Sequence, residues 1–333
     1  MTKLVVTIKS TTTPDEIKRM LSTGLSCFRL NCAHLTRDQI GSTSSMIREA
    51  CTSTGVTPKL FMDLPGIKSR IWYKPSERIT IKTNDRFTIR RTNQPTSYNG
   101  CFHITGDNFF FNIRDNDVLQ VRRRENVRLQ VVECNRNEMQ VVSLGEGQIG
   151  WGYYIIAENK YIPSIDLEES DKELLPIVLR AEPDFIGASF ADTPEMIRSL
   201  KANIQSLNTN TSYRPGILAK IESPIAVSNV SEILKECDGA IIGRDDLSTW
   251  LTGNLNEATY QVISACKQQN KLSVPASNYY SSLCTSDDLS EENRKDIMDV
   301  LAYRPNYLYC NETHKTDCWE NVVRYSLELG MAL

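Results

Sequence analysis

Short apolar runs alternate with amphipathic stretches through the first 63 residues of the chain. Three runs have the length and composition of buried strands: LVVTI (4–8), CFRL (27–30) and KLFMD (59–63). After the first, TPDE (13–16) forms a capping box with proline at the first helical position, and Gly24 is a plausible helix stop. This β-α-β-α-β order predicts parallel strands joined by right-handed crossovers.

The periodicity changes between about residues 68 and 160. Short strand-like segments follow one another there, separated by turn residues, and NRN (135–137) is typical of a hairpin loop. No helix of convincing amphipathic length is indicated. We therefore expect an inserted all-β domain, residues 68–160, between residues 1–67 and 161–333.

The helix–strand alternation returns after residue 161 and ends with a helix at CWENVVRYSLELG (318–330). Three strands before the insertion and five after it make the eight strands of a (β/α)8 barrel. A doubly wound open sheet would tolerate the same order, but eight is the number that closes. The five later strands are DFIGASF (184–190), GILAKI (216–221), GAIIGR (239–244), LSVPAS (272–277) and NYLYC (306–310).

Composition places the chain among ordinary globular proteins. Of its 333 residues 40% are hydrophobic and 24% are charged, and the net charge of −3 gives no reason to expect nucleic acid or membrane partners. Ten cysteines without a CxxC pair indicate reduced thiols packed as small hydrophobes. The start, MTKLVVTIKS, is too short an apolar run for a signal peptide. We expect a cytoplasmic protein.

Polar residues gather at the predicted carboxyl ends of the strands, where barrel enzymes carry their catalytic groups. No serine–histidine or cysteine–histidine pair supports a hydrolase triad, and neither GxGxxG nor GxxxxGK[ST] occurs. The residues at these ends are Arg29, Asn31, His34, Asp63, Ser189, Lys220, Glu222, Arg244, Asp245, Asp246, Ser277 and Glu312.

The segment AKIES (219–223) is the most informative of these ends. Lys220 and Glu222 lie two apart and therefore point to the same side of a strand, where a plain ion pair is one reading. The next strand supplies Asp246, a second carboxylate placed to join Glu222. Two oxygen ligands from neighbouring strands are a usual way to hold Mg²⁺. A nearby lysine would then stabilise charge on a phosphoryl group or an enolate.

These segments together resemble the pyruvate kinase family, whose barrel and insertion match the layout of the chain over essentially its full length. Six segments resemble family motifs in the same order. They are FRLNCAHL (family M-R-L-N-F-S-H-G), MDLPGIKSR (L-D-T-K-G-P-E-I-R), AKIES (S-K-I-E-N), GRDDL (A-R-G-D-L), PASNY (T-A-T-Q-M) and YCNETHK (L-S-G-E-T-A-K).

The resemblance implies a metal-dependent phosphotransferase. Glu222 and Asp246 would hold Mg²⁺ or Mn²⁺, and Lys220 would lie against the transferring phosphoryl group and the enolate oxygen. Ser277 would be tied to protonation through its hydroxyl. It would also contact the small carboxylate substrate, with Gly243, Asp245 and Asp246.

The nucleotide, ATP or ADP, would be contacted by Arg29 and Arg70, with Asn31 and His34 beside them. The insertion would be a lid that closes over it and excludes water. The bland reading of His34 is a hydrogen-bonded structural histidine, and that of Ser277 is a plain strand-end hydroxyl.

Several positions depart from the family pattern. At the monovalent-cation site Asn31 and Asp63 remain, but Ala33 and Leu64 replace residues with hydroxyls. Potassium-dependent members have glutamate at the position of Lys68, whereas potassium-independent members have lysine there, as this chain does. The ammonium group of Lys68 could therefore substitute for the ion. We expect no K⁺ requirement.

Asp245 replaces a glycine whose N–H lies near the substrate carboxylate in the family. Its side chain could point inward, at an electrostatic cost, or away from the site. Pro65 replaces a lysine, and Cys310 and Asn311 replace a serine–glycine pair. Cys310 itself is expected to be a packed thiol. Replacements of the surrounding residues, with Lys220 itself kept, fit a changed substrate better than a loss of activity.

Family members continue into a C-terminal domain with the effector site, whereas this sequence stops at Leu333. We therefore expect no allosteric control through that domain, and a monomer or homodimer rather than a tetramer. Two functions remain beside a pyruvate kinase-like phosphotransferase. They are a metal-enolate aldolase or lyase on the same fold, and a catalytically inactive nucleotide-binding protein.

Overall fold

The computed structural model describes residues 1–66, 69–71, 78–92, 100–104, 107–122, 126–150, 153–158, 160–163, 166–207, 212–314 and 317–333. The chain forms two compact units. The first comprises Met1–Pro65 and Ile165–Leu333, and the second comprises Gly66–Ser164.

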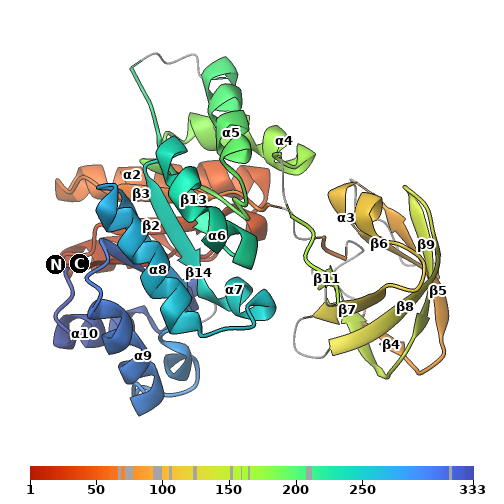
Figure 1. Cartoon of the computed structure of the whole chain (residues 1–333). Helices are drawn as coiled ribbons and strands as arrows, with labels where there is room; N and C mark the ends of the chain where they lie inside the picture. Colours follow the sequence, from red (N-terminus) through yellow and green to blue (C-terminus); the bar gives the residue numbers. More distant parts are fainter. Residues whose placement is uncertain are drawn as a thin grey trace. The chain divides into compact units, whose positions relative to one another are not determined.

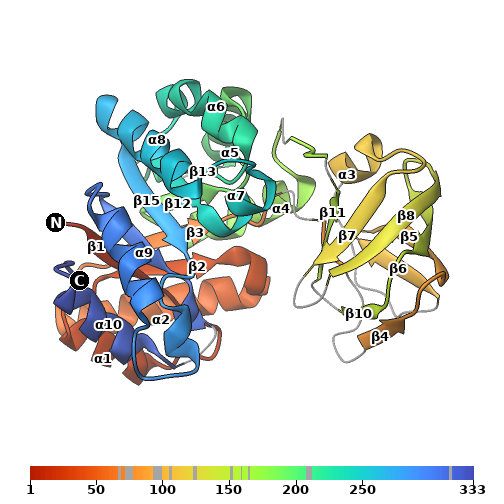
Figure 2. The same ribbon diagram turned by 60° about the horizontal axis from the view of Figure 1, so that its bottom comes forward.

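The first unit is a closed barrel of eight strands in the order β1-β16-β15-β14-β13-β12-β3-β2, which confirms the predicted fold class. All neighbouring strands are parallel, and helices cover the outside of the barrel (Figures 1 and 2). The strands are β1 (Lys3–Thr7), β2 (Cys27–Asn31), β3 (Lys59–Asp63), β12 (Phe185–Ala188), β13 (Gly216–Ile221), β14 (Gly239–Gly243), β15 (Leu272–Ser277) and β16 (Tyr307–Cys310).

Several helices of the barrel begin at a residue whose side chain caps them, among them α1, α2, α6, α8 and α9. The predicted capping box of the first helix is present, since the Thr13 hydroxyl accepts from the N–H of Glu16 and the Glu16 carboxylate accepts from the N–H of Thr13. The helices are α1 (Pro14–Ser22), α2 (Arg37–Thr54), α4 (Glu169–Arg180), α5 (Pro194–Leu207), α6 (Pro224–Ile233), α7 (Arg244–Trp250), α8 (Leu255–Gln268), α9 (Glu291–Leu301) and α10 (Trp319–Glu328).

The interior of the barrel is packed with side chains from alternate strand residues, as expected for this fold. The ring of Phe61 stacks on Phe185 with centroids 4.9 Å apart and meets Tyr307 and Tyr309 edge-on at 5.2 and 5.6 Å. This apolar layer packs inside the barrel, directly below the polar residues at the carboxyl ends of the strands. Its buried members are Val5, Cys27, Phe61, Leu218, Ile241, Val274, Ala276, Tyr307 and Tyr309.

The second unit is built from strands, with a six-stranded sheet in the order β11-β7-β8-β9-β5-β6 and a two-stranded sheet β10-β4. The hairpin predicted at 135–137 joins β8 to antiparallel β9. One short helix, α3, was not indicated by the sequence pattern. The elements are β4 (Arg78–Ile81), β5 (Arg86–Arg91), β6 (Cys101–Ile104), α3 (Asp107–Asn112), β7 (Val118–Arg122), β8 (Asn126–Cys134), β9 (Glu138–Ser143), β10 (Gly147–Gly150) and β11 (Tyr154–Ala157).

All ten cysteines are free, and only Cys134 and Cys284 are partly exposed. The thiols therefore act as small hydrophobic side chains, as predicted. Within the described parts of the chain, no helix is both long and apolar enough to cross a membrane.

The buried thiols are expected to lower the stability of the barrel in alkali. Burial raises the pKa of Cys266 to about 12, and burial also raises the pKa of Cys237. A thiol in the unfolded chain titrates near pH 8.5. Above this pH the folded state binds more protons than the unfolded state, so the free energy of unfolding falls as pH rises towards 12.

We expect each such thiol to lower the free energy of unfolding by up to about 1.4 kcal/mol per pH unit above about pH 9. Urea unfolding at pH 7, 8, 9 and 10 measures this. Cys266→Ala should flatten the slope above pH 9, while its value at pH 7 reports the packing loss separately. If the free energy of unfolding fell with pH as steeply in Cys266→Ala as in the parent, the raised pKa of Cys266 would not be the cause.

Candidate active site

The candidate site lies at the carboxyl ends of the barrel strands, where the inward-facing side of each strand changes from apolar to polar. In β13, Leu218 lies in the apolar interior and Lys220, two residues later, continues the same face. In β3, Phe61 is followed in the same way by Asp63. Arg29 in β2 pairs in register with Phe61. The alternation of strand residues thus delivers charged groups to one rim.

The ammonium group of Lys220 is the centre of this rim. Its Nζ lies 2.9 Å from Oε1 of Glu222 and 3.7 Å from Oδ2 of Asp63. It also donates a hydrogen bond of 2.8 Å to the hydroxyl of Ser189, which in turn donates to the carbonyl of Leu64. The side chain of Lys220 is only 12% exposed, so these interactions take place largely away from water.

Arg29 is held beside Lys220 by a shared carboxylate. Its Nε and Nη2 lie 2.9 and 2.8 Å from Oδ2 of Asp63, while Nη1 donates to the hydroxyl of Thr7 at 3.1 Å and to Oδ1 of Asn311 at 2.7 Å. The guanidinium also lies over the ring of Tyr309, 5.1 Å from its centroid. These contacts fix the guanidinium in one orientation at the end of β2.

Both cations stay charged despite their burial. Burial by itself would lower the pKa of Lys220, but the charges of Glu222 and Asp63 outweigh it and raise that pKa. Burial likewise opposes the charge of Arg29, and the charge of Asp63 again leaves the pKa of Arg29 raised. The rim therefore presents a fixed ammonium and a fixed guanidinium at neutral pH.

Asp63 is 1% exposed, and its second oxygen, Oδ1, has no hydrogen-bond partner among the described residues. A β-carbon at Gly187 in β12 would lie 2.4 Å from this oxygen and 3.0 Å from Cγ. Only glycine at position 187 therefore leaves room for the Asp63 carboxylate.

Glu222 is fixed through both of its oxygens. Oε1 faces Lys220, and Oε2 accepts a hydrogen bond of 2.9 Å from the N–H of Phe190. Phe190 has φ +52°, a left-handed conformation that is strained for a bulky residue and that is often found at functional sites. The strained turn after β12 thus directs the N–H of Phe190 towards the carboxylate of Glu222.

Glu222 and Asp246 have the donor chemistry that a divalent cation requires. A β-carbon at Gly243 would lie 2.6 Å from Cγ and 2.8 Å from Oε1 of Glu222, so the glycine leaves room for this side chain. Asp246 is half-buried in the first turn of α7, directly after β14. Where the chain is described, no cluster of three or more metal-ligating side chains occurs. A two-carboxylate site, completed by water and substrate oxygens, fits these residues.

The side chain of Asp245 lies against the end of β15. Its Oδ1 accepts a hydrogen bond of 2.8 Å from the hydroxyl of Ser277, and its Oδ2 accepts one of 2.5 Å from the amide of Asn278. Asn311 donates from its amide to the carbonyl of Ser277 at 3.3 Å. The hydroxyl of Ser277 and the amide of Asn278 thus hold the Asp245 carboxylate against the end of β15.

Other residues predicted for the site have structural contacts. Asn31 caps the short helix η1 (Cys32–His34), because its Oδ1 accepts from the N–H of Ala33 at 3.2 Å. His34 is exposed within the same turn. Arg244 is 4% exposed and forms two hydrogen bonds, of 3.0 and 2.8 Å, with the carboxylate of Asp296, so it anchors α9.

Glu312 and Cys310 also form structural hydrogen bonds. Oε1 of Glu312 accepts from the N–H of Tyr280 at 2.8 Å, and Oε2 accepts from the Cys310 thiol at 3.3 Å. Arg70 belongs to the second unit, where its backbone forms an isolated antiparallel β-bridge with that of Tyr154. Lys68, the predicted substitute for a monovalent ion, lies outside the described residues.

Sequence reasoning missed several residues that the structure places at the rim. Thr7 in β1 and Asn311 after β16 hold Arg29, and Asn278 holds Asp245. The sequence did contain a signal for Thr7 and Asn311. Thr7 lies two residues after buried Val5, and Asn311 lies two residues after Tyr309, in the same inward phase as Arg29.

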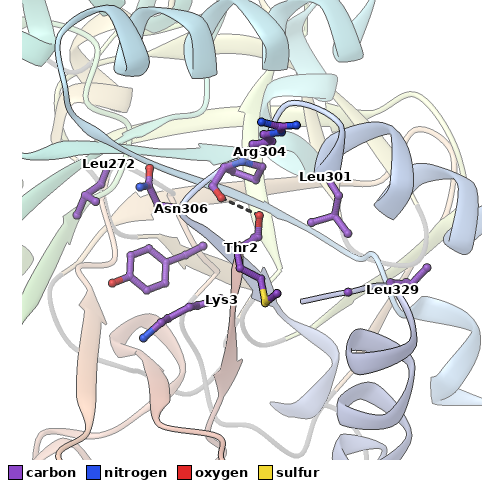
Figure 3. Close-up of a pocket in the computed structure, with 11 residues that line it drawn as sticks. Thr2, Lys3, Leu272, Leu301, Arg304, Asn306 and Leu329 are labelled. Atoms are coloured by element: carbon purple, nitrogen blue, oxygen red, sulfur yellow. Dashed lines mark hydrogen bonds between the residues drawn. The ribbon is translucent and has the colours of Figure 1, made fainter. Parts of the chain in front are cut away.

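A separate cavity of about 610 Å³ opens at the opposite, amino-terminal ends of β1, β15 and β16 (Figure 3). Its wall includes Lys3, Leu272, Asn306 and Leu329, and Thr2 donates a hydrogen bond of 2.7 Å to the carbonyl of Pro305 there. No carboxylate side chain lines this cavity. It therefore lacks the converging acids and cations that mark the rim as the candidate active site.

Comparison with known proteins gives one consistent result. The family model "pyruvate kinase, barrel domain" matches residues 1–302. The pyruvate kinase of Thermococcus litoralis is 24% identical over 255 residues, which is 74% of this chain and 51% of that protein. The chloroplastic pyruvate kinase isozyme A of Ricinus communis is 24% identical over 324 residues, 92% of this chain and 54% of that protein. The chain thus spans about half the length of these relatives.

Solved structures share the fold. The crystal structure of Cryptosporidium parvum pyruvate kinase superimposes with a TM-score of 0.86 at 19% identity, covering 98% of this chain and 69% of that one. The pyruvate kinase of Pyrobaculum aerophilum gives a TM-score of 0.80 at 20% identity, covering 98% of this chain and 72% of that one.

Proposed function

The chain belongs to the pyruvate kinase family, and on this premise we propose that it is a phosphotransferase acting between a nucleotide and phosphoenolpyruvate, pyruvate or a related small carboxylate. The observation that carries the proposal is the position of Lys220, whose ammonium lies between Glu222 and Asp63 with Arg29 beside it. Phosphoryl transfer depends mainly on positioned positive charge, and this rim supplies it.

We propose that Glu222 and Asp246 hold Mg²⁺ or Mn²⁺. When bound there, such an ion would neutralise charge on the phosphoryl group and on the substrate oxygens. Lys220, kept protonated by its carboxylate neighbours, would stabilise the same charge from the protein side. Ser277 would carry the proton exchanged with the enolate carbon, and its hydroxyl already has a carboxylate partner in Asp245.

The nucleotide contacts are a further part of the proposal. Arg29 is rigidly held at the rim and would face the transferred phosphate, with Asn31 and His34 on the adjoining turn. Arg70, in the second unit, would add a second guanidinium. Arginine suits this role because its planar fork matches phosphate oxygens.

The direct test is conversion of phosphoenolpyruvate and ADP to pyruvate and ATP in the presence of Mg²⁺. We expect turnover that disappears when EDTA removes the metal. Mg-nucleotide binding without turnover would indicate a different acceptor or an inactive binding protein. Absence of both would overturn the proposal.

We also propose that the reaction needs no K⁺. Ala33 and Leu64 offer no side-chain oxygen to a monovalent cation, and Lys68 would supply an ammonium group in its place. Rates in K⁺ and in tetramethylammonium salts should agree within about twofold, and Lys68→Glu should create a K⁺ requirement by removing the ammonium. A many-fold rise on adding K⁺ to the parent protein would refute this proposal.

A further inference from the structure

Arg29 is bound to Asp63 through a single carboxylate oxygen. Its Nε and Nη2 lie 2.9 and 2.8 Å from Oδ2, whereas the usual arginine–carboxylate fork places one nitrogen on each oxygen. Two contacts to one atom let a planar group pivot about that atom. Asp63 therefore holds the guanidinium at the end of β2 without setting its rotation, so contacts at the remaining nitrogen, Nη1, decide the rotation.

Asn311 makes the shorter of the two contacts at Nη1. Its Oδ1 accepts a hydrogen bond of 2.7 Å from this nitrogen, and the hydroxyl of Thr7 accepts one of 3.1 Å. A guanidinium carries five N–H groups. The contacts involve the N–H of Nε, both of Nη1 and one side of Nη2, so one N–H of Nη2 has no partner among the described residues. The direction of this N–H, which a ligand oxygen can accept, follows from the rotation that Asn311 fixes.

The amide of Asn311 joins two groups with opposite requirements. The guanidinium of Arg29 only donates, and the backbone carbonyl of Ser277 only accepts. Oδ1 of Asn311 meets the first, and its Nδ2 donates to the second at 3.3 Å. An aspartate would satisfy the guanidinium alone, and a leucine of similar shape would satisfy neither group. The pyruvate kinase pattern has glycine at this position, so this link between the ends of β2 and β15 is a feature of this chain.

We propose that Asn311 is a positioning residue for phosphoryl transfer. It acts through Arg29, because its amide fixes the rotation of the guanidinium relative to the end of β15 and so directs the open N–H of Nη2 at the phosphoryl group. Asn311 itself touches no reacting atom. This inference rests on the proposed function in one respect, namely that Arg29 faces the phosphoryl group while the metal and Lys220 bind the rest of the substrate.

Phosphoenolpyruvate and oxalate are suitable probes for this role. Both present a carboxylate and a neighbouring oxygen to a bound metal, but only phosphoenolpyruvate carries a phosphoryl group. Their dissociation constants can be measured by titration calorimetry with Mg²⁺ and without nucleotide, so no turnover is needed. Asn311→Leu keeps the approximate shape of the side chain and removes both of its hydrogen bonds, and urea unfolding checks that the variant is folded.

We expect Asn311→Leu to bind phosphoenolpyruvate about 10- to 100-fold more weakly than the parent, which is the range of one charge-assisted hydrogen bond that is no longer aligned. Oxalate should bind within about threefold of the parent, because it has no group for Arg29 to contact. Asn321→Leu is the matched control, since it removes a hydrogen bond of 3.0 Å to Asp287 from α10. It should change neither dissociation constant.

The same substitution in an Arg29→Lys protein tests whether Asn311 acts through Arg29. Lysine keeps the positive charge beside Asp63, but its ammonium is a point charge with rotatable donors and needs no fixed edge. Asn311→Leu should therefore change the affinity for phosphoenolpyruvate by less than about threefold in this background. A residue that only supports the end of β16 would have the same effect in both backgrounds and on both ligands.

The outcomes separate the two proposals. If phosphoenolpyruvate and oxalate both bind the parent in a Mg²⁺-dependent manner, and Asn311→Leu weakens them equally, weakens neither, or acts equally in the Arg29→Lys protein, the positioning role is wrong and the proposed function stands. If neither ligand binds the parent with Mg²⁺, the metal–anion site is wrong, and this inference falls with it.

Discussion

Lys220→Met is expected to lower the phosphotransferase rate by at least about 10³-fold, because it removes the ammonium at the centre of the rim. Methionine has a similar length, so the packing of β13 is kept. The substitution leaves Glu222, 2% exposed, without its cation. Removing one partner of a buried ion pair costs about 3–5 kcal/mol, and the remaining contact of Asp63 with Arg29 should hold the loss near the lower value.

The matched control is Lys201→Met, the same change in a surface ion pair. Nζ of Lys201 in α5 lies 3.2 Å from Glu236, and the two side chains are 47% and 27% exposed. Such a pair contributes at most about 1 kcal/mol, and activity should be unchanged. Steady-state rates and urea unfolding distinguish the two variants. A Lys220→Met protein that keeps more than a tenth of the parent rate would show that the ammonium is not essential.

Gly187→Ala is expected to destabilise the barrel by about 3 kcal/mol and to remove most of the activity. The new β-carbon would lie 2.4 Å from Oδ1 of Asp63 and 3.1 Å from Cδ1 of Ile241. Asp63 cannot rotate away without releasing Arg29, which binds its other oxygen at 2.9 Å. Overpacking costs about 1–3 kcal/mol, and the disturbed ion pair adds to this.

Gly41→Ala provides the opposite result from the same chemical change. Gly41 lies inside α2, and a β-carbon there would meet no atom within 4 Å. Alanine should therefore stabilise the protein by about 0.5–1 kcal/mol through helix propensity alone. Urea midpoints that shift in opposite directions for the two variants would support the close approach at Asp63. Equal stability of Gly187→Ala and the parent would contradict it.

Much of the fold follows from local patterns. The capping box at Thr13 and Glu16 and the hairpin at 135–137 are formed by residues close in sequence, and both were predicted correctly. The eight strands were recognisable because each is a short apolar run next to an amphipathic stretch. The short helix α3 was missed, since six residues carry too little helical periodicity to detect.

The components of the site could be predicted, but not all of their contacts. Strand ends placed Lys220 and Arg29 at one rim, because a side chain two residues beyond a buried one continues the same face. The contact of Arg29 with Asn311 joins residues 282 positions apart in the sequence. Only closure of the barrel, with β16 and β2 on either side of β1, brings these two side chains together.

The sequence by itself determined the barrel, the insertion and the residue types at the strand ends, because period-two alternation and helix capping act over a few neighbouring residues. The tertiary structure decided that Asp245 lies against Ser277 and Asn278, and that Gly187 makes room for Asp63. The direction of a side chain and the space around it depend on atoms from strands far apart in the chain. These are fixed only when the barrel closes and its interior is packed.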